Sequence, residues 1–166
     1  MLENRVYIAL ALSLAPNIVV GMADLPSGST TGSRRLQNMI ARTEDWTRQL
    51  TDLNSEAKAQ QCLNVFAPIL PLELEAQRLY LDTLTDDLSN HLGGLAIYSS
   101  ASAALIPAAL AHLPILSLSS GISGNGDMRM GTPQQILREV LLGVDIFAVE
   151  FAVSYTHLTL PTKRIV

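Results

Sequence analysis

Short apolar runs alternate with longer segments of helical periodicity, and this alternation limits the possible folds more than any other feature of the chain. Five runs have the length and composition of strands buried on both faces of a parallel sheet: 18–24, 61–70, 93–100, 114–120 and 143–151. Helices are expected in the segments between them: 33–53, 71–91, 100–113 and 131–143. The resulting order, β-α-β-α-β-α-β-α-β, predicts an α/β fold with right-handed crossovers.

Each expected helix is indicated by the spacing of its apolar residues and by residues that commonly start or end a helix. The first has one apolar stripe, made of Leu36, Met39, Ile40, Trp46, Leu50 and Leu53. In the second, Pro71 suits the first turn, and the leucines expected to be buried are Leu74, Leu81, Leu84 and Leu88. Pro107 is expected to start the third helix. The fourth has Thr132 as its cap, Pro133 at its first position, Gln135 in a capping box and Gly143 at its end.

This periodicity leaves two architectures open. One is an open, doubly wound sheet, and the other is part of a (β/α)8 barrel. Such a barrel takes about 250 residues, so four and a half units in about 150 residues would make just over half of one. In either architecture, functional residues are expected at the C-terminal ends of the strands.

Composition fits one globular domain and excludes several classes of site. Hydrophobic residues make up 48% of the 166-residue chain and charged residues only 16%, so much of the surface is expected to be covered. The single cysteine, Cys62, excludes an internal disulfide and a thiolate-rich zinc site within this chain. The net charge of −4 argues against an autonomous nucleic-acid-binding protein, which needs a basic surface.

The apolar segment 6–15 near the N-terminus allows two interpretations. It has the composition of a signal-peptide core, and it also suits a helix that ends before Pro16. Glu3 beside Arg5 is unusual for a signal peptide, so we expect the helix. A membrane span is not expected, because polar residues and Pro16 interrupt the apolar run.

Few residues carry chemistry by their pattern alone. Asp24 ends the first expected strand, where a carboxylate can accept hydrogen bonds from an amine-bearing ligand or simply form a turn. The glycine-rich segment 119–131 lies between a strand and a helix, but it lacks the spacing of known phosphate loops. His91 and His112 have no second ligand at metal spacing. These residues do not form a convincing catalytic group.

Five stretches carry a resemblance to a known family: PNIVVGMADLPSG, RRLQNMIARTEDWTRQL, VFAPILPLELEAQRLYLDTL, GLAIYSS and QQILREVLLGVDIF. In this order they resemble the tRNA-guanine transglycosylase family, above all the non-catalytic accessory subunits of queuine tRNA-ribosyltransferase in fungi. They are spread over residues 16–147 in the family's order. The resemblance implies an irregular (β/α)8 TIM barrel with an added C-terminal zinc region, of which this chain would contain about half of the strands.

The resemblance also implies a missing nucleophile. Catalytic members end their last strand motif, G-[VI]-D-[ML]-F-D, with an Asp that attacks the ribose carbon. In this chain the motif runs from Gly143 to Ala148, and alanine has no group that can form a covalent intermediate. Glu150 shares the strand face of Ala148 but lies beyond the motif.

The base-binding residues are implied in the same way. Asp24 matches an Asp that contacts the incoming base in catalytic members, which makes it a substrate-binding candidate. A literal match of GGLA would place the family's base-reading glycines at residues 93–96. Matching the strand instead places Tyr98, Ser99 and Ser100 there. We prefer the strand match, which implies a damaged base pocket.

By resemblance, the full-length protein would pair with the catalytic subunit in a heterodimer and help to hold tRNA. It would support the exchange of guanine for queuine at the wobble position. Zinc is expected in the full-length family member, while this chain lacks the family's zinc ligands. The resemblance implies a cytoplasmic location and leaves association with the mitochondrial surface open. The alternatives are a catalytically active base-exchange enzyme and a secreted or membrane-anchored α/β domain.

The C-terminal tail, residues 153–166, has a different character from the rest of the chain. Its first part, VSYTHLTLPT, is encoded by one reading frame of a transposase-type sequencing adapter, and a sample index followed by a stop codon accounts for the remainder. The other interpretation is an edge strand, because SYTHLTL alternates acceptably. We expect a partial barrel domain over residues 1–152 and a non-native tail over 153–166.

Overall fold

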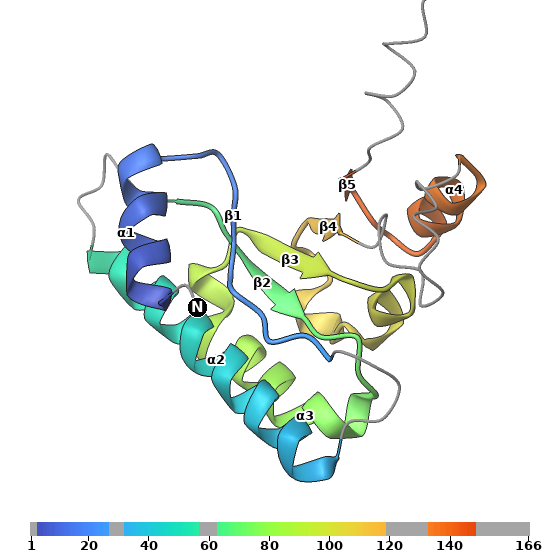
Figure 1. Cartoon of the computed structure of the whole chain (residues 1–166). Coiled ribbons are helices and arrows are strands. Elements are labelled where there is room, and N and C mark those ends of the chain that lie inside the picture. The colour runs from blue at the N-terminus through green and yellow to red at the C-terminus, as the bar shows by residue number, and fades with distance from the viewer. Residues whose placement is uncertain (1–2, 27–31, 57–62, 119–132, 149–166) are drawn as a thin grey trace, which may run out of the picture.

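The computed structural model describes residues 3–26, 32–56, 63–118 and 133–148. Within these ranges five strands form one parallel sheet (Figure 1). They are β1 (Val19–Val20), β2 (Val65–Ile69), β3 (Gly94–Ile97), β4 (Ile115–Ser117) and β5 (Ile146–Phe147). Their order in the sheet is β1-β2-β3-β4-β5, the same as in the chain.

This order decides between the two architectures. A doubly wound sheet reverses its strand order at a switch point, whereas a barrel adds each strand beside the previous one. The described strands show no reversal, and the sheet curls into half of a barrel (Figure 1). The prediction of a partial TIM barrel is therefore confirmed.

The strand register divides the side chains between two faces of the curled sheet. Phe66, Ala96 and Leu116 form a small buried cluster on the inner face, and Val20 and Ile146 pack against it. The outer face contributes a larger core, to which the strands supply Val19, Val65, Ala67, Ile69, Leu95, Ile97 and Ile115. Alternation along each strand thus separates the barrel interior from the layer that packs against helices.

Helix α1 (Asn4–Leu14) precedes the first strand. Ile8 and Ala11 are buried in the outer core, and Ala15 ends the helix in the left-handed conformation with φ 44°. The predicted helix is therefore confirmed. The hydroxyl of Tyr7 also donates a hydrogen bond to the carbonyl oxygen of Val20 at 2.6 Å, which ties the helix to β1. None of the helices in the described ranges is long and apolar enough to cross a membrane.

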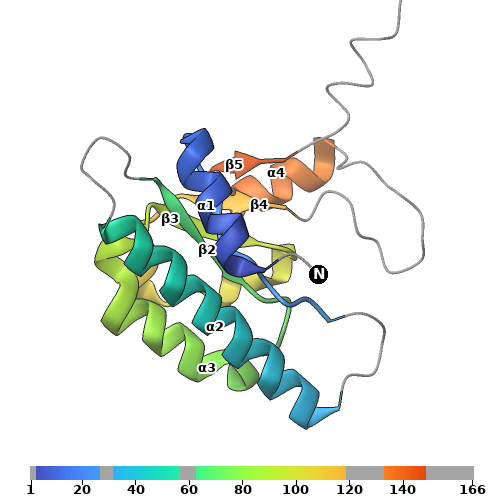
Figure 2. The same cartoon turned by 60° about the vertical axis from the view of Figure 1, so that its left-hand side comes forward.

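Helices α2 (Ser33–Glu56) and α3 (Leu74–Thr83) lie side by side against the sheet (Figure 2). In α2, Met39, Ile40 and Leu50 are buried as predicted, whereas Leu53 is 39% exposed. The buried side of α2 also contains a line of polar residues that the apolar spacing did not indicate: Thr43, Thr47 and Thr51. They tolerate burial because the hydroxyls of Thr47 and Thr51 donate to backbone carbonyls one turn back.

The second predicted helix is correct in place but wrong at its start. Pro71 precedes the helix, and Leu74 in the first turn is 43% exposed. Gln77 takes the inward position instead, and its side-chain amide donates to the carbonyl oxygens of Leu70 and Leu72 at 3.0 and 2.9 Å. These bonds satisfy backbone groups where β2 ends. The chain continues as a π-helical turn, η1 (Leu84–Leu88), and a 3-10 turn, η2 (Ser89–His91).

The third connection differs from the expected α-helix. It consists of two 3-10 helices, η3 (Ser100–Leu105) and η4 (Ala108–Leu110). Pro107 does precede the second of them, and its carbonyl oxygen accepts from the backbone N–H of Leu110 at 2.9 Å. Ile106, the residue before Pro107, is extended with ψ 124°, so the proline divides the connection into two short 3-10 segments.

Helix α4 (Pro133–Leu141) starts at the proline that the sequence predicts. Gly143 follows it with φ 89°, a conformation that favours glycine, and so ends the helix as expected. Thr132, the predicted cap, lies outside the described residues, as do the glycine-rich segment 119–131 and the tail 153–166.

Candidate functional site

A cavity opens at the C-terminal ends of the first three strands, where barrel enzymes place their active sites. Its volume is about 320 Å³. It is lined by Gln135 of α4 and by residues that follow β1, β2 and β3: Leu25, Pro26, Pro71, Tyr98, Ser99 and Ser100. We call this cavity the mouth pocket.

Ala148 lies on the inner face at this same end of the sheet. Ile146 packs with the inner cluster and Phe147 with the outer core, so the next residue faces inward again. The backbone N–H of Ala148 donates to the carbonyl oxygen of Ser117 at 3.0 Å, which continues the parallel ladder beyond β5. The position implied for the nucleophile therefore belongs to the barrel interior, and it carries only a methyl group.

Tyr98 and its neighbours occupy the part of the mouth pocket that follows β3. Tyr98 comes two residues after Ala96, so it also lies on the inner face. Burial raises the pKa of the Tyr98 hydroxyl, which therefore stays neutral at physiological pH and can donate or accept a hydrogen bond. Ser99 turns the chain into η3 through its carbonyl oxygen, which accepts from the backbone N–H of Ser102 at 2.9 Å.

Gly94 lies at the opposite end of β3 from the mouth pocket. A Cβ at this position would stand 2.5 Å from two ring atoms of Phe66, so glycine is required there by packing. If the family's base-reading glycines corresponded to residues 93–96, they would lie far from the mouth pocket. Aligning the strand instead puts Tyr98, Ser99 and Ser100 at those positions, and these residues do line the mouth pocket.

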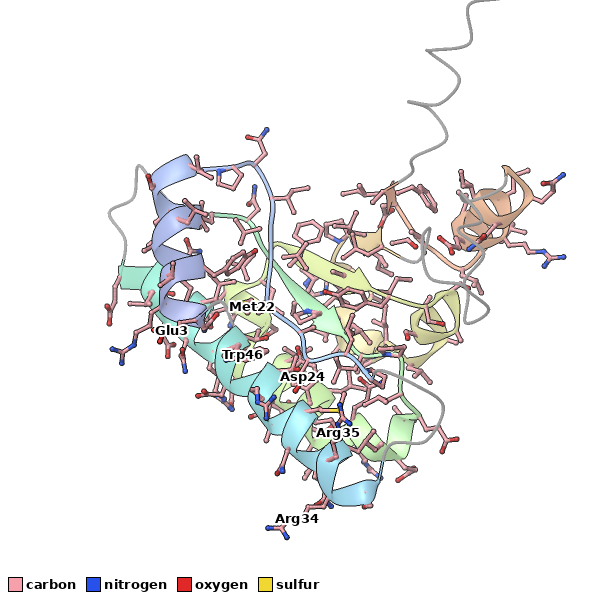
Figure 3. The ribbon with its side chains drawn as sticks, in the orientation of Figure 1. Glu3, Met22, Asp24, Arg34, Arg35 and Trp46 are labelled. Atoms are coloured by element: carbon pink, nitrogen blue, oxygen red, sulfur yellow. The ribbon has the colours of Figure 1, made fainter. Side chains whose placement is uncertain are left out.

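Asp24 lies after the end of β1, beside α2 rather than in the mouth pocket (Figure 3). Its backbone N–H donates to the hydroxyl of Thr43 at 3.1 Å, and its carboxylate accepts from the guanidinium of Arg42 at 2.5 Å. The guanidinium carbon of Arg42 in turn lies 5.9 Å from the centre of the Trp46 ring. The Asp24 carboxylate is therefore engaged with α2, and its role toward a base stays a prediction.

Pro68 explains why Asp24 can reach α2. Gly21 donates to the carbonyl oxygen of Phe66 at 2.9 Å, but Pro68, two residues further along β2, has no N–H for the next bond. Its Cδ also lies 3.1 Å from the position of a Cβ on Gly21. Strand pairing therefore stops after β1, which is much shorter than the predicted strand 18–24.

Asp145 is the other carboxylate of the last strand motif, and it has a structural position. One of its carboxylate oxygens accepts from the backbone N–H of Ile115 at 2.9 Å. This bond joins the starts of β4 and β5, at the end of the sheet opposite the mouth pocket. Glu150 and Cys62 lie outside the described residues.

The remaining candidates do not gather into a site. The side chains of Ser55 and His91 lie 3.2 Å apart, and His112 contacts the carbonyl oxygen of Ala109 at 2.9 Å. Among the residues that the structure describes, no group of His, Cys, Asp or Glu could hold a metal ion. These side chains therefore do not fit the zinc that the resemblance implies for the full-length family member.

Comparison with known proteins identifies the lineage of this half-barrel. The family model described as queuine tRNA-ribosyltransferase matches residues 1–159. The chain belongs to this family. A curated relative in Schizosaccharomyces pombe, queuine tRNA-ribosyltransferase accessory subunit 2, is 27% identical over 160 residues, covering 93% of this chain and 33% of the relative. The chain thus spans about a third of the length of that relative.

One arrangement in this queuine tRNA-ribosyltransferase family member was not anticipated from its sequence. A second cavity, of about 420 Å³, lies at the start of α2 and is lined by Asp24, Arg34, Arg35, Asn38, Met39 and Arg42. We call it the arginine pocket. In the sequence, only the adjacent Arg34 and Arg35 at the beginning of a predicted helix could have indicated this pocket. Nothing in the periodicity indicated that Asp24 would join them.

Proposed function

We propose that this chain is part of a non-catalytic accessory subunit of a heterodimeric queuine tRNA-ribosyltransferase. In this role it supports the exchange of guanine for queuine at the wobble position of tRNA, while a catalytic partner subunit supplies the nucleophile. Two findings support this role: the chain belongs to the family, and its S. pombe relative is an accessory subunit.

The position of Ala148 carries the proposal. Base exchange through a covalent intermediate needs a nucleophile beside the ribose, and the inner face at the mouth is where a barrel presents one. The methyl group of Ala148 occupies that place. Asp24, which matches the family's base-contacting Asp, is engaged with Arg42, and Asp145 of the last strand motif is engaged with the backbone of Ile115.

The mouth pocket supports the same conclusion. Tyr98 places a bulky, neutral phenol where the resemblance expects glycine, and the pocket retains a volume of about 320 Å³. A planar base that enters a catalytic member's pocket needs close backbone approach, which glycine permits and tyrosine opposes. We infer that catalytic base binding belongs to the partner, and that zinc is held by a region of the full-length protein outside this chain.

A base-exchange assay tests this proposal directly. The full-length protein from the same gene is purified alone and together with the catalytic subunit, and incorporation of labelled guanine into tRNA is measured. We expect exchange only when the catalytic subunit is present, because only that subunit has a nucleophile at this position. Replacing the nucleophilic Asp of the partner by Asn should then abolish exchange by the pair.

Two outcomes would contradict the proposal. One is exchange, or a covalent tRNA adduct, formed by the full-length protein without its partner. The other is a failure of the two proteins to co-purify, with the catalytic subunit fully active alone. A matched variant, Ala148→Asp, distinguishes a missing nucleophile from a damaged pocket. We expect it to stay inactive in the absence of the partner, because Tyr98 still occupies the mouth.

A further inference from the structure

The arginine pocket at the start of α2 has a charge pattern that differs from the rest of this acidic chain. Arg34, Arg35 and Arg42 line it, with Asp24 as the one acidic residue among the lining side chains. The amide of Asn38 adds neutral hydrogen-bonding groups. The local charge is therefore positive, although the chain as a whole carries −4.

The placement of two of these arginines opposes the usual electrostatics of a helix. The N-terminal end of a helix has a partial positive charge, so acidic residues are favoured in its first turn. The first turn of α2 contains no acidic residue and begins Ser33-Arg34-Arg35. A bound anion at this end of α2 would be attracted both by the helix dipole and by the positive charges of the arginines. Departures of this kind from local rules are expected at functional sites.

Arg42 is held in place at the edge of the same cavity. The carboxylate of Asp24 accepts from its guanidinium at 2.5 Å, and the ring of Trp46 lies beneath it, 5.9 Å from the guanidinium carbon. The guanidinium has five N–H donors, and one carboxylate oxygen cannot satisfy all of them. An ordered guanidinium with donors left over is suited to bind a second oxyanion.

Figure 3 shows how the other two arginines are arranged. Arg35 lies near Asp24, whereas Arg34 extends toward solvent from the end of α2. Long side chains of this kind can close over a ligand from the rim of a cavity. The cavity volume of about 420 Å³ leaves room for a phosphate group among them.

We propose that the arginine pocket binds a phosphate group, either of a free phosphate compound or of an RNA backbone. Guanidinium groups match the geometry of phosphate oxygens through paired hydrogen bonds. Arg42 supplies donors beside Asp24, and Arg34 and Arg35 add positive charge from the first turn of α2. This site lies on the helix side of the barrel, apart from the mouth pocket, so it does not depend on the proposed accessory role.

Trp46 provides a reporter beside the site, because it contacts Arg42 and is the single tryptophan of the chain. The full 166-residue chain is titrated with inorganic phosphate, and with a short RNA that lacks terminal phosphates, at constant low ionic strength. Fluorescence of Trp46 is recorded, and sodium chloride at equal ionic strength serves as the blank. We expect a saturable change with phosphate and none with chloride, since Arg42 responds to the bound anion.

The double variant Arg34→Gln/Arg35→Gln tests the site while leaving Arg42 and the reporter in place. Both residues are exposed, so we expect native far-UV circular dichroism and phosphate binding weakened about tenfold or more. Arg78→Gln, an exposed arginine on α3, is the matched control and should bind phosphate as wild type does.

The RNA titration identifies the source of the phosphate. Displacement of inorganic phosphate by RNA, with a salt dependence that weakens in the double variant, supports an RNA backbone. Phosphate binding that RNA does not affect supports a free phosphate compound. The proposal is overturned if neither ligand gives a saturable change, if chloride reproduces the change, or if the folded double variant binds as tightly as Arg78→Gln.

Discussion

The ring of Phe66 in β2 lies so close to Gly94 in β3 that a Cβ on the glycine would stand 2.5 Å from two ring atoms. The same Cβ would lie 2.7 Å from the carbonyl oxygen of Pro114. Phe66 and Gly94 are register partners on the inner face, and Phe66 is 3% exposed. Glycine at this position therefore lets an aromatic ring close the bottom of the half-barrel.

We predict that Gly94→Ala destabilises the fold by about 1–3 kcal/mol, because the added methyl overpacks the inner face against a ring and a backbone carbonyl. Urea denaturation followed by circular dichroism measures the change. Gly32→Ala is the matched control, since its Cβ position has no atom within 4 Å among the described residues other than its chain neighbours, and it should stay within about 0.5 kcal/mol of wild type. Equal effects of the two substitutions would show that the close packing of Phe66 is not limiting.

Asn54 forms a two-bond clamp with the backbone at the start of β2. Its amide donates to the carbonyl oxygen of Leu63 at 3.0 Å, and its side-chain oxygen accepts from the N–H of Leu63 at 2.7 Å. Asn54→Ala leaves both buried groups unpaired, so we expect a loss of about 2–4 kcal/mol in unfolding free energy. Asn90→Ala, at an exposed position, should have little effect. A small loss at Asn54 would mean that water replaces the clamp.

Tyr80 predicts how stability depends on alkaline pH. Its hydroxyl is fully buried and donates to the carbonyl oxygen of Pro68 at 2.8 Å, and burial raises its pKa well above the ordinary value. The unfolded chain ionises this group near pH 10 while the folded chain keeps it protonated. The contribution of Tyr80 to stability is therefore complete below about pH 10 and falls by about 1.4 kcal/mol per pH unit above it.

Denaturation at several pH values from 8 to 11 checks this dependence. Tyr80→Phe should cost about 1–3 kcal/mol at pH 8, since Pro68 loses its donor. Above pH 10 the gap between the two proteins should narrow, because phenylalanine cannot ionise. A gap that stays constant across this range would contradict the assignment.

Substitutions of Asp145 test whether its carboxylate has a structural or a catalytic role. Asp145→Ala removes the acceptor of the Ile115 N–H, and we expect it to cost about 1–3 kcal/mol in unfolding free energy. Asp145→Asn keeps an oxygen acceptor and should recover most of that stability. In the base-exchange assay with the catalytic partner, folded Asp145→Asn should retain activity. Loss of exchange without loss of stability would instead assign Asp145 a role in the reaction.

The tail leads to a prediction about the gene. A long sequencing read across the source locus should show the reading frame continuing past Phe151 without VSYTHLTLPT. We expect the continuation to encode a cysteine-rich stretch with a histidine, which would supply the zinc ligands. Finding the tail in the genome would refute the adapter interpretation and favour the edge strand.

Several features of the fold followed from the sequence because they depend on local periodicity. The order of strands and connecting helical segments, the helix that ends before Pro16, and the helix end at Gly143 are confirmed. Two details were wrong for the same kind of reason. Leu74 lies in a first turn beyond the reach of the core, and Pro107 divides the third connection into two 3-10 helices instead of starting an α-helix.

The candidate site could be predicted only in part. The position of Ala148 at the inner face agrees with the motif, because strand alternation fixes which side a residue takes. The contact of Asp24 with Arg42 could not be predicted, because it depends on where β1 stops. That stop is caused by Pro68, which lies in a different strand and is distant in the sequence.

The sequence by itself thus determined the succession of elements, which is a property of short stretches, and its resemblance to the family implied that Ala148 stands at the nucleophile position. The tertiary structure decided the half-barrel strand order, the burial of threonines in α2, and the gathering of arginines beside Asp24. These features arise from pairings between residues far apart along the chain. Backbone hydrogen bonds and close packing select such pairings only when the sheet has formed.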